Sequence, residues 1–256
     1  VFSYFPGYCN NRTDCLLAWN SDMAAGLERV YDLRNSFDIS SANMSIGGGQ
    51  YFSTCDGAVS SVLVDAINNL RAAGIATAVA AGNDGYTSSI GSPACISGAI
   101  SVGATDDNDD IASFSNNTDF LSLLAPGVSI TSSVPGGSAT SSYNGTSMAA
   151  PHVAGAWAVL KQRNPTLSVS EALNALRTTG TLILDQRIGG SSTIPRIDIG
   201  RAYNIIFTDD FETDKGWITN PFSVDLATAG TWERANPQDT LIQSGTAVSD
   251  NFDLVS

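Results

Sequence analysis

The apolar residues of this chain follow two patterns, a helical spacing and short continuous runs, and these patterns predict its elements. A helix is predicted over residues 21–37, then a strand over 39–46 that runs into three glycines. A second helix is predicted over residues 56–73, with Gly74 at its end. The apolar residues at helical spacing are Met23, Leu27, Val30, Tyr31 and Phe37 in the first helix, and Val59, Val62, Leu63, Ala66, Ile67 and Leu70 in the second.

Two nearly continuous apolar runs, residues 75–80 and 100–104, are typical of strands buried on both faces. The first run ends in a polar loop that contains Asn83. A helix, a buried strand and a polar loop at the carboxyl end of that strand indicate a parallel sheet of the βαβ type. The sequence therefore predicts an α/β fold, with a further strand over residues 121–127.

The later part of the chain continues this pattern and then changes. A helix is predicted from Thr146 to about Arg163, and Ser168 and Glu171 form a capping-box pattern that opens another. The last element of the α/β domain is predicted near residues 196–203. From residue 206 onward, tryptophan, glycine and proline residues are spaced as in short strands and turns. We expect an α/β domain over residues 1–205 and an incomplete all-β module, resembling a β-sandwich, over residues 206–256.

Ser147 is the first candidate for chemistry. An Asn-Gly pair precedes Thr146 and Ser147, so the serine is predicted at a corner between a strand and a helix. The free N–H groups at the start of a helix favour negative charge, which suits acyl transfer by a serine nucleophile. Two other interpretations remain open: an ordinary turn with a helix cap, or a serine that binds phosphate.

The composition narrows the class of protein. Acidic residues outnumber basic ones, 25 to 12, and the formal net charge is −13. This argues against nucleic acid and anionic membranes as partners. No apolar run approaches the ~20 residues that cross a bilayer.

The four cysteines are even in number and contain no C-x-x-C pair, which disfavours a metal site. Cys9 and Cys15 lie close together in a polar loop that suits a local disulfide, and Cys55 and Cys95 are then expected to pair across the fold. The alternative is four free, buried thiols. Disulfides indicate an oxidising, extracellular setting, so we expect a secreted protein.

The stretch from Asn144 to Gly155, N-G-T-S-M-A-A-P-H-V-A-G, resembles the nucleophile signature of the subtilisin-like serine peptidases, the subtilases. The resemblance implies that Ser147 is the nucleophile and that Thr146 supports an oxyanion hole. The loop A-A-G-N-D-G resembles the family's oxyanion loop, which implies that the Asn83 amide donates to the developing oxyanion. By itself, Asn-Asp-Gly is also a common turn.

Two further segments resemble parts of the family that contact substrate. N-M-S-I-G-G resembles the strand that pairs with the substrate backbone, and the segment around Pro93 resembles the lining of the pocket for the side chain before the scissile bond. The substrate-binding residues that this implies are Ser45, Ile46, Gly47, Gly48, Ala80, Ala81, Gly82, Gly91, Ser92, Pro93 and Ala94. No cofactor is expected to be required. Calcium is an optional ligand of many subtilases, and the acidic loop over residues 106–110 is either a calcium site or a solvated loop.

A catalytic triad also needs a histidine base and an acid. The one histidine, His152, is five residues after Ser147 on the same predicted helix, so the two side chains point about 140° apart and cannot meet. The family's D-[ST]-G and H-G-T-H segments do not precede Ser147. We therefore expect a fragment of a serine endopeptidase that acts on peptides or proteins as a monomer, inactive by itself. The alternative is a binding or adhesion protein with a peptidase fold that has lost catalysis.

Overall fold

The computed structural model describes residues 3–4, 16–137, 139–188, 192–206, 240–241 and 247–248. The chain divides into two compact units, Val1–Phe207 and Thr208–Ser256. In the second unit the described residues form an antiparallel pair of strands, β13 (Thr240–Leu241) and β14 (Ala247–Val248). The rest of the predicted all-β module lies outside the described residues.

The first unit is built on a six-stranded sheet in the order β11-β12-β8-β7-β5-β3. Neighbouring strands are parallel, except that β11 is antiparallel to β12. The strands are β3 (Ser41–Met44), β5 (Ala76–Ala80), β7 (Ile100–Thr105), β8 (Leu123–Pro126), β11 (Thr181–Leu184) and β12 (Thr193–Arg196). The predicted α/β class, a mostly parallel sheet flanked by helices, is confirmed.

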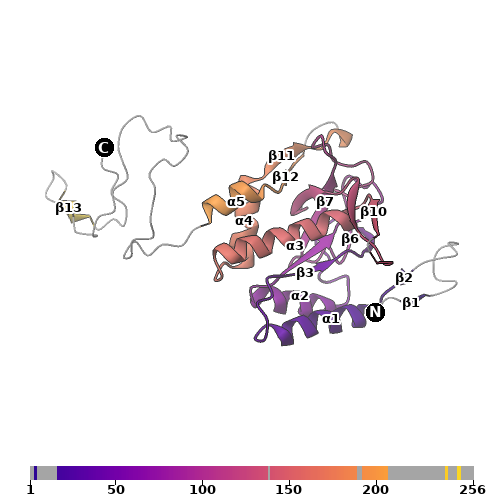
Figure 1. Ribbon diagram of the computed structural model, residues 1–256, viewed down its shortest axis with the longest axis horizontal. Coiled ribbons are helices and arrows are strands. Elements are labelled where there is room, and N and C mark those ends of the chain that lie inside the picture. Colours follow the sequence, from indigo (N-terminus) through magenta and orange to yellow (C-terminus); the bar gives the residue numbers. More distant parts are fainter. Residues whose placement is uncertain are drawn as a thin grey trace. The chain divides into compact units, whose positions relative to one another are not determined.

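Helices cover both faces of this sheet (Figure 1). One face packs against α1 (Asn20–Leu33) and α2 (Ser61–Ala72), and the other against α3 (Thr146–Arg163), α4 (Val169–Thr179) and α5 (Ile199–Ile205). Successive strand residues point to opposite faces. In β8, Leu123 belongs to the same buried cluster as Trp157 of α3, whereas Leu124 belongs to the cluster of Ile67 in α2. Both faces are apolar, and this explains the continuous apolar runs in the sequence.

Shorter elements surround the sheet. The structure has β1 (Ser3–Tyr4), β2 (Leu16–Leu17), β4 (Gly48–Tyr51), β6 (Ile90–Ser92), the hairpin of β9 (Ile130–Ser133) and β10 (Thr140–Tyr143), and the 3-10 helix η1 (Gln186–Ile188).

Two helix predictions need correction at their ends. The helix predicted from residue 56 begins only at Ser61, because the Cys55 carbonyl accepts the N–H groups of Ala58 and Val59 in a separate turn. Val62, predicted on the buried face, is 51% exposed. The first helix ends at Leu33, and Phe37 lies in the following turn with 61% of its surface exposed.

The capping box at the start of α4 is confirmed. The Ser168 hydroxyl accepts the Glu171 N–H at 3.2 Å, and the Glu171 carboxylate accepts the Ser168 N–H at 2.8 Å. These hydrogen bonds lower the pKa of Glu171.

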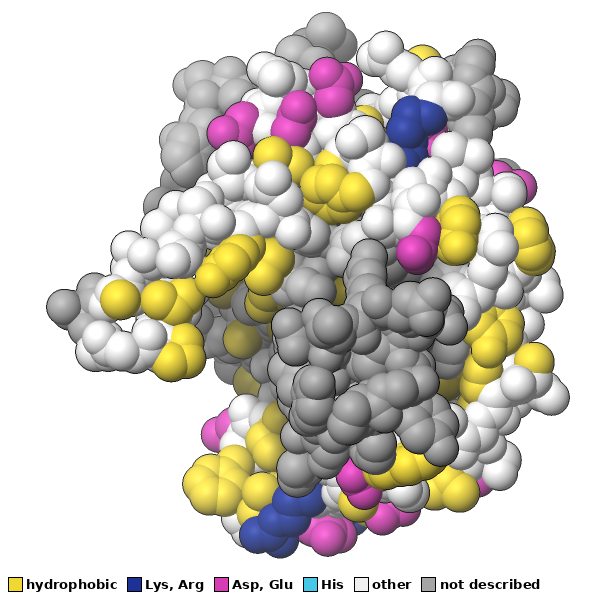
Figure 2. All heavy atoms as spheres, turned by 90° about the vertical axis from the view of Figure 1, so that its right-hand side faces the viewer, with side chains coloured by type: hydrophobic (Ala, Val, Ile, Leu, Met, Phe, Trp, Pro, Cys, Tyr) yellow, Lys and Arg dark blue, Asp and Glu magenta, His cyan; other side chains and the backbone are white. Residues whose placement is uncertain are grey.

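The surface of the first unit follows the acidic composition. Acidic and apolar side chains appear at several places on the face in Figure 2, and basic ones are few. Among the described helices, none is long and apolar enough to span a bilayer.

Candidate active site

Ser147 lies at the corner where the β9–β10 hairpin turns into α3. Gly145 caps the helix with φ 157° and ψ 157°, a backbone conformation that is essentially confined to glycine. The Ser147 hydroxyl is half-buried and makes only a long contact, 3.4 Å, to the Ser45 carbonyl. In return the Ser45 hydroxyl donates to the Ser147 carbonyl at 2.8 Å. The serine is therefore held by its backbone, while its hydroxyl remains available to another partner.

Asn83 lies beside the start of the same helix. Its Oδ1 accepts hydrogen bonds from the Thr146 N–H at 2.8 Å and from the Thr146 hydroxyl at 3.0 Å. The Thr146 hydroxyl also accepts the Gly82 N–H at 3.2 Å. With Oδ1 fixed by two donors, the Nδ2 amide of Asn83 must point the other way, out of this contact. Thr146, which is fully buried, thus sets the orientation of the Asn83 side chain.

Two nitrogen atoms that carry N–H groups lie close to one point next to Gly145. A Cβ atom added at Gly145 would lie 3.6 Å from Ser147 N and 3.7 Å from Asn83 Nδ2. Within the described part of the chain, neither donor has an acceptor. Two N–H donors near one location, at the positive end of an 18-residue helix, suit the stabilisation of a developing oxyanion.

The predicted substrate segments meet at this corner. In β4 and β6, Gly48 pairs with Ser92, and the Gly91 N–H donates to the Ala81 carbonyl at 2.9 Å. A Cβ atom at Gly47 would lie 3.3 Å from the Ser92 carbonyl oxygen and 3.6 Å from that of Ala80. The segments 45–48, 80–82 and 91–94 therefore lie next to one another, and Gly48 already pairs with Ser92.

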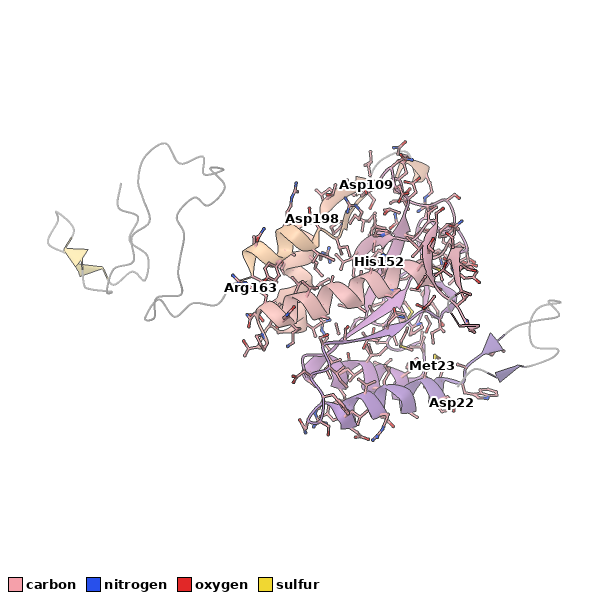
Figure 3. The ribbon with its side chains drawn as sticks, viewed as in Figure 1. Asp22, Met23, Asp109, His152, Arg163 and Asp198 are labelled. Carbon is pink, nitrogen blue, oxygen red and sulfur yellow. A yellow bond between two sulfur atoms is a disulfide. The ribbon has the colours of Figure 1, made fainter. Side chains whose placement is uncertain are left out.

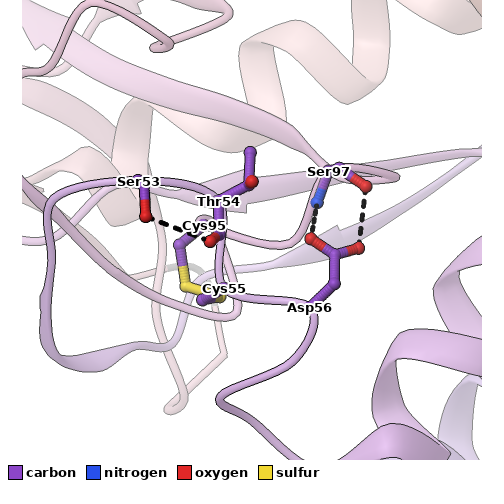
Figure 4. The surroundings of a disulfide bond; sticks show 6 residues. All are labelled: Ser53, Thr54, Cys55, Asp56, Cys95 and Ser97. Carbon is purple, nitrogen blue, oxygen red and sulfur yellow. Dashed lines mark hydrogen bonds between the residues drawn. A yellow bond between two sulfur atoms is a disulfide. The ribbon is translucent and has the colours of Figure 1, made fainter.

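A disulfide holds two of these segments together. Cys55 and Cys95 are bonded, as predicted (Figure 4). The Cys55 N–H also donates to the Cys95 carbonyl at 3.0 Å. The Asp56 carboxylate accepts the Ser97 hydroxyl at 2.7 Å and the Ser97 N–H at 3.2 Å. The loop after β4 is thus tied to the loop after β6, directly behind residues 91–94. The other predicted pair, Cys9 and Cys15, lies outside the described residues.

His152 lies on α3, one turn after Met148 (Figure 3). Its Nδ1 is 2.8 Å from the Met148 carbonyl oxygen. Ser147 and His152 lie on the same helix, five residues apart, as the sequence predicted, so their side chains point in different directions. No other histidine occurs among the described residues.

In the acidic loop over residues 106–110, two carboxylates bind groups of the protein itself. Asp106 Oδ1 accepts the N–H groups of Asn108 and Asp110 at 2.9 and 3.0 Å, and Asp109 pairs with Arg196. No group of three or more His, Cys, Asp or Glu side chains that would hold a metal ion occurs among the described residues.

A cluster of buried polar side chains next to the loop that carries Asn83 was not predicted from the sequence. Asn116 and Asn117 are buried in the loop before β8, and Asp185, after β11, is fully buried against Arg187. Burial, the largest influence, raises the pKa of Asp185, but hydrogen bonds from Arg187 and Asn117 together outweigh it and leave this pKa lowered. In the sequence, two adjacent asparagines in a polar stretch indicate a turn at the surface. Their burial and their contacts are seen only in the structure.

Comparison with known proteins gives a consistent result. The subtilase family model matches residues 16–197. Subtilisin DY of Bacillus licheniformis is 40% identical over 177 residues, which cover 68% of this chain and 60% of that protein. An extracellular serine proteinase of Thermus sp. (strain Rt41A) is 43% identical over 158 residues, 61% of this chain and 36% of that protein.

The fold is likewise similar to solved structures. A cold-adapted subtilisin-like serine proteinase superimposes with a TM-score of 0.59 at 30% identity, and the match covers 71% of this chain and 63% of that one. The prenylagaramide maturation protease PagA gives a TM-score of 0.62 at 25% identity, over 74% of this chain and 68% of that one. The chain thus spans less than two thirds of subtilisin DY and of the cold-adapted proteinase.

Proposed function

Because this chain belongs to the subtilase family of serine peptidases, we propose that it carries the nucleophile and the oxyanion hole of a secreted serine endopeptidase that hydrolyses peptides and proteins. Ser147 is the nucleophile. Its N–H group and the Asn83 amide stabilise the oxyanion, and Thr146 holds Asn83 in place. The observation that carries this proposal is that Ser147 N and Asn83 Nδ2 both lie within 3.7 Å of one point beside Gly145. No organic cofactor is required.

The proposed reaction needs a histidine base beside Ser147, and the described residues do not place one there. A hydroxyl becomes a useful nucleophile when an adjacent base takes its proton. The only histidine in the sequence is His152, and its Nδ1 is occupied by the Met148 carbonyl. We therefore expect the chain by itself to be inactive, and its histidine and aspartate partners to come from residues other than these.

Added imidazole tests this proposal in the chain as it is. A peptide p-nitrophenyl ester is offered with increasing imidazole, and release of nitrophenol is compared between the natural chain and Ser147→Ala. We expect no difference without imidazole, and a Ser147-dependent increment that grows with imidazole concentration. An equal rate in both proteins at every concentration would favour the peptidase-fold binding protein that has lost catalysis.

A further inference from the structure

The loop that carries Asn83 is not part of any helix or strand, so its shape must come from contacts. Residues 81–86 pass over the buried side chain of Asn116, which contacts this loop with all its polar atoms. Asn116 Oδ1 accepts the Asp84 N–H at 2.9 Å and the Tyr86 N–H at 3.1 Å. Its Nδ2 donates to the Ala81 carbonyl at 3.2 Å and to Asp84 Oδ2 at 3.2 Å.

Backbone contacts reinforce this arrangement. The Asn116 N–H donates to the Gly82 carbonyl at 3.0 Å, and the Asn117 N–H donates to the Tyr86 carbonyl at 2.7 Å. Gly82 adopts φ +111°, and a Cβ atom there would lie 2.2 Å from Asn116 Nδ2. The loop therefore closes around the Asn116 amide only because residue 82 has no side chain.

Asn116 is itself held in place by a buried ion pair. The neighbouring Asn117 donates to Asp185 Oδ2 at 2.6 Å, and Arg187 binds both oxygens of Asp185 at 2.9 and 2.7 Å. Arg187 Nη1 also donates to the carbonyl oxygen of Ser115 at 2.7 Å. The segment before β8 is thus fixed through Ser115 and Asn117, the residues on either side of Asn116, and these contacts hold the Asn116 side chain against the loop.

We infer that Asn116 is a positioning residue for the oxyanion hole. Asn83 is oriented from two sides: Thr146 holds its side-chain carbonyl, and Asn116 holds the backbone on either side of it. Asn116 does not touch the reacting atoms. Its removal leaves Asn83 on a loop without its central support, so that the Nδ2 donor loses its fixed direction. This inference rests on the proposed function, because it assigns a role toward the proposed oxyanion site.

Binding of a charged peptide tests the inference without turnover. Two peptides of the same sequence are titrated into the full chain by calorimetry, one ending in a phosphonate and one in a neutral carboxamide. The phosphonate presents anionic, tetrahedral oxygens to the two donors, so the ratio of the two affinities reports the oxyanion hole. A general loss of structure weakens both peptides and leaves the ratio unchanged.

We expect the natural chain to prefer the phosphonate peptide, and Asn83→Ala to lose most of that preference. Asn116→Ala is expected to reduce the ratio at least about tenfold. This is the size expected when the Asn83 amide no longer donates its hydrogen bond to the charged phosphonate. The matched control is Asn164→Ala. Asn164 is also a buried asparagine, and it accepts the Thr166 N–H and hydroxyl at 3.1 and 2.9 Å in the loop between α3 and α4. We expect this variant to unfold more easily and to keep the natural ratio.

The outcomes separate the two claims. A preference that Asn83→Ala abolishes and Asn116→Ala retains would overturn the inference and leave the proposed function intact. No preference in the natural chain would overturn the oxyanion hole itself, and the inference with it. If Asn116→Ala does not fold, Asn116→Ser supplies a neutral hydroxyl for one of the two N–H groups. This variant is expected to fold with a smaller reduction in the ratio, and an unchanged ratio would contradict the inference.

Discussion

The buried carboxylate of Asp185 gives the sharpest stability prediction. Four N–H donors converge on it: two from the Arg187 guanidinium, the Arg187 backbone N–H at 3.0 Å, and the Asn117 amide. Asp185→Asn keeps the volume of the side chain but removes the charge and replaces one acceptor oxygen with a donor. That new donor faces Arg187 or Asn117, both of which are donors themselves.

The size of the effect follows from this geometry. Breaking a buried ion pair by removing one partner costs about 3–5 kcal/mol, because the remaining charge is left without compensation. The Arg187 side chain is 20% exposed and keeps its contacts to backbone carbonyls, so the lower end of that range applies. We expect the free energy of unfolding to fall by about 3 kcal/mol in Asp185→Asn at pH 7.

The same carboxylate predicts how stability depends on pH. The pKa of Asp185 is lower in the folded chain than in the unfolded chain, so the unfolded state takes up protons first as the pH falls. Its contribution is therefore complete above the unfolded pKa of about 3.9 and is lost as the pH falls through the folded pKa. The difference in stability between the natural chain and Asp185→Asn should shrink in this acidic range.

Urea unfolding at pH 7 and in the acidic range measures both effects. Arg201→Ala serves as the control, because its ion pair with Asp198 is exposed, with 70% of the arginine side chain in solvent. We expect the control to change stability by less than about 1 kcal/mol. A loss below about 1 kcal/mol in Asp185→Asn, or a difference that does not narrow on acidification, would refute the reasoning.

Three more predictions concern the disulfide and two glycines. Replacing Cys55 and Cys95 together by serine opens a 40-residue loop and should lower stability by about 4 kcal/mol, the chain-entropy value, in urea unfolding; a midpoint equal to that of the natural chain would disprove this. Gly145→Ala should lower the free energy of unfolding by about 1–3 kcal/mol through backbone strain. It should also lower the preference for the phosphonate peptide, because the new methyl group lies beside both donors. An unchanged affinity ratio would contradict this. In Gly127→Ala the new methyl group would lie 2.5 Å from the Ala104 Cβ, so thermal unfolding should reveal a loss of about 1–3 kcal/mol, and an unaltered melting temperature would contradict this packing.

The fold was largely predictable because its core is periodic. The strands β5 and β7 consist of continuous apolar runs, and the helices α3 and α4 carry apolar residues at helical spacing. Both patterns can be recognised in one sequence without an alignment. The hairpin of β9 and β10 was not predicted. It is rich in serine and threonine and mostly exposed, so no pattern of buried apolar residues indicates its pairing.

Only the site residues that lie within recognisable sequence motifs could be predicted. Ser147, Thr146 and Asn83 lie in two segments that resemble a known family, and the structure brings these segments together. Asn116 is 33 positions from Asn83 in the sequence, and nothing in its own surroundings distinguishes it from a turn residue. Asp185 likewise looks like a surface acid after a strand. Tertiary contacts alone define the roles of these two residues.

The central claim is that Ser147 is a nucleophile served by an Asn83 oxyanion donor. Its most direct test is mass spectrometry of the chain after exposure to a peptide p-nitrophenyl ester and imidazole. We predict an acyl adduct on Ser147 whose rate of formation rises with imidazole and falls about 10²–10³-fold in Asn83→Ala, a magnitude taken from the loss of one such donor in subtilisin. An adduct spread over other hydroxyl groups, or one on Ser147 that forms equally fast in Asn83→Ala, would contradict the account.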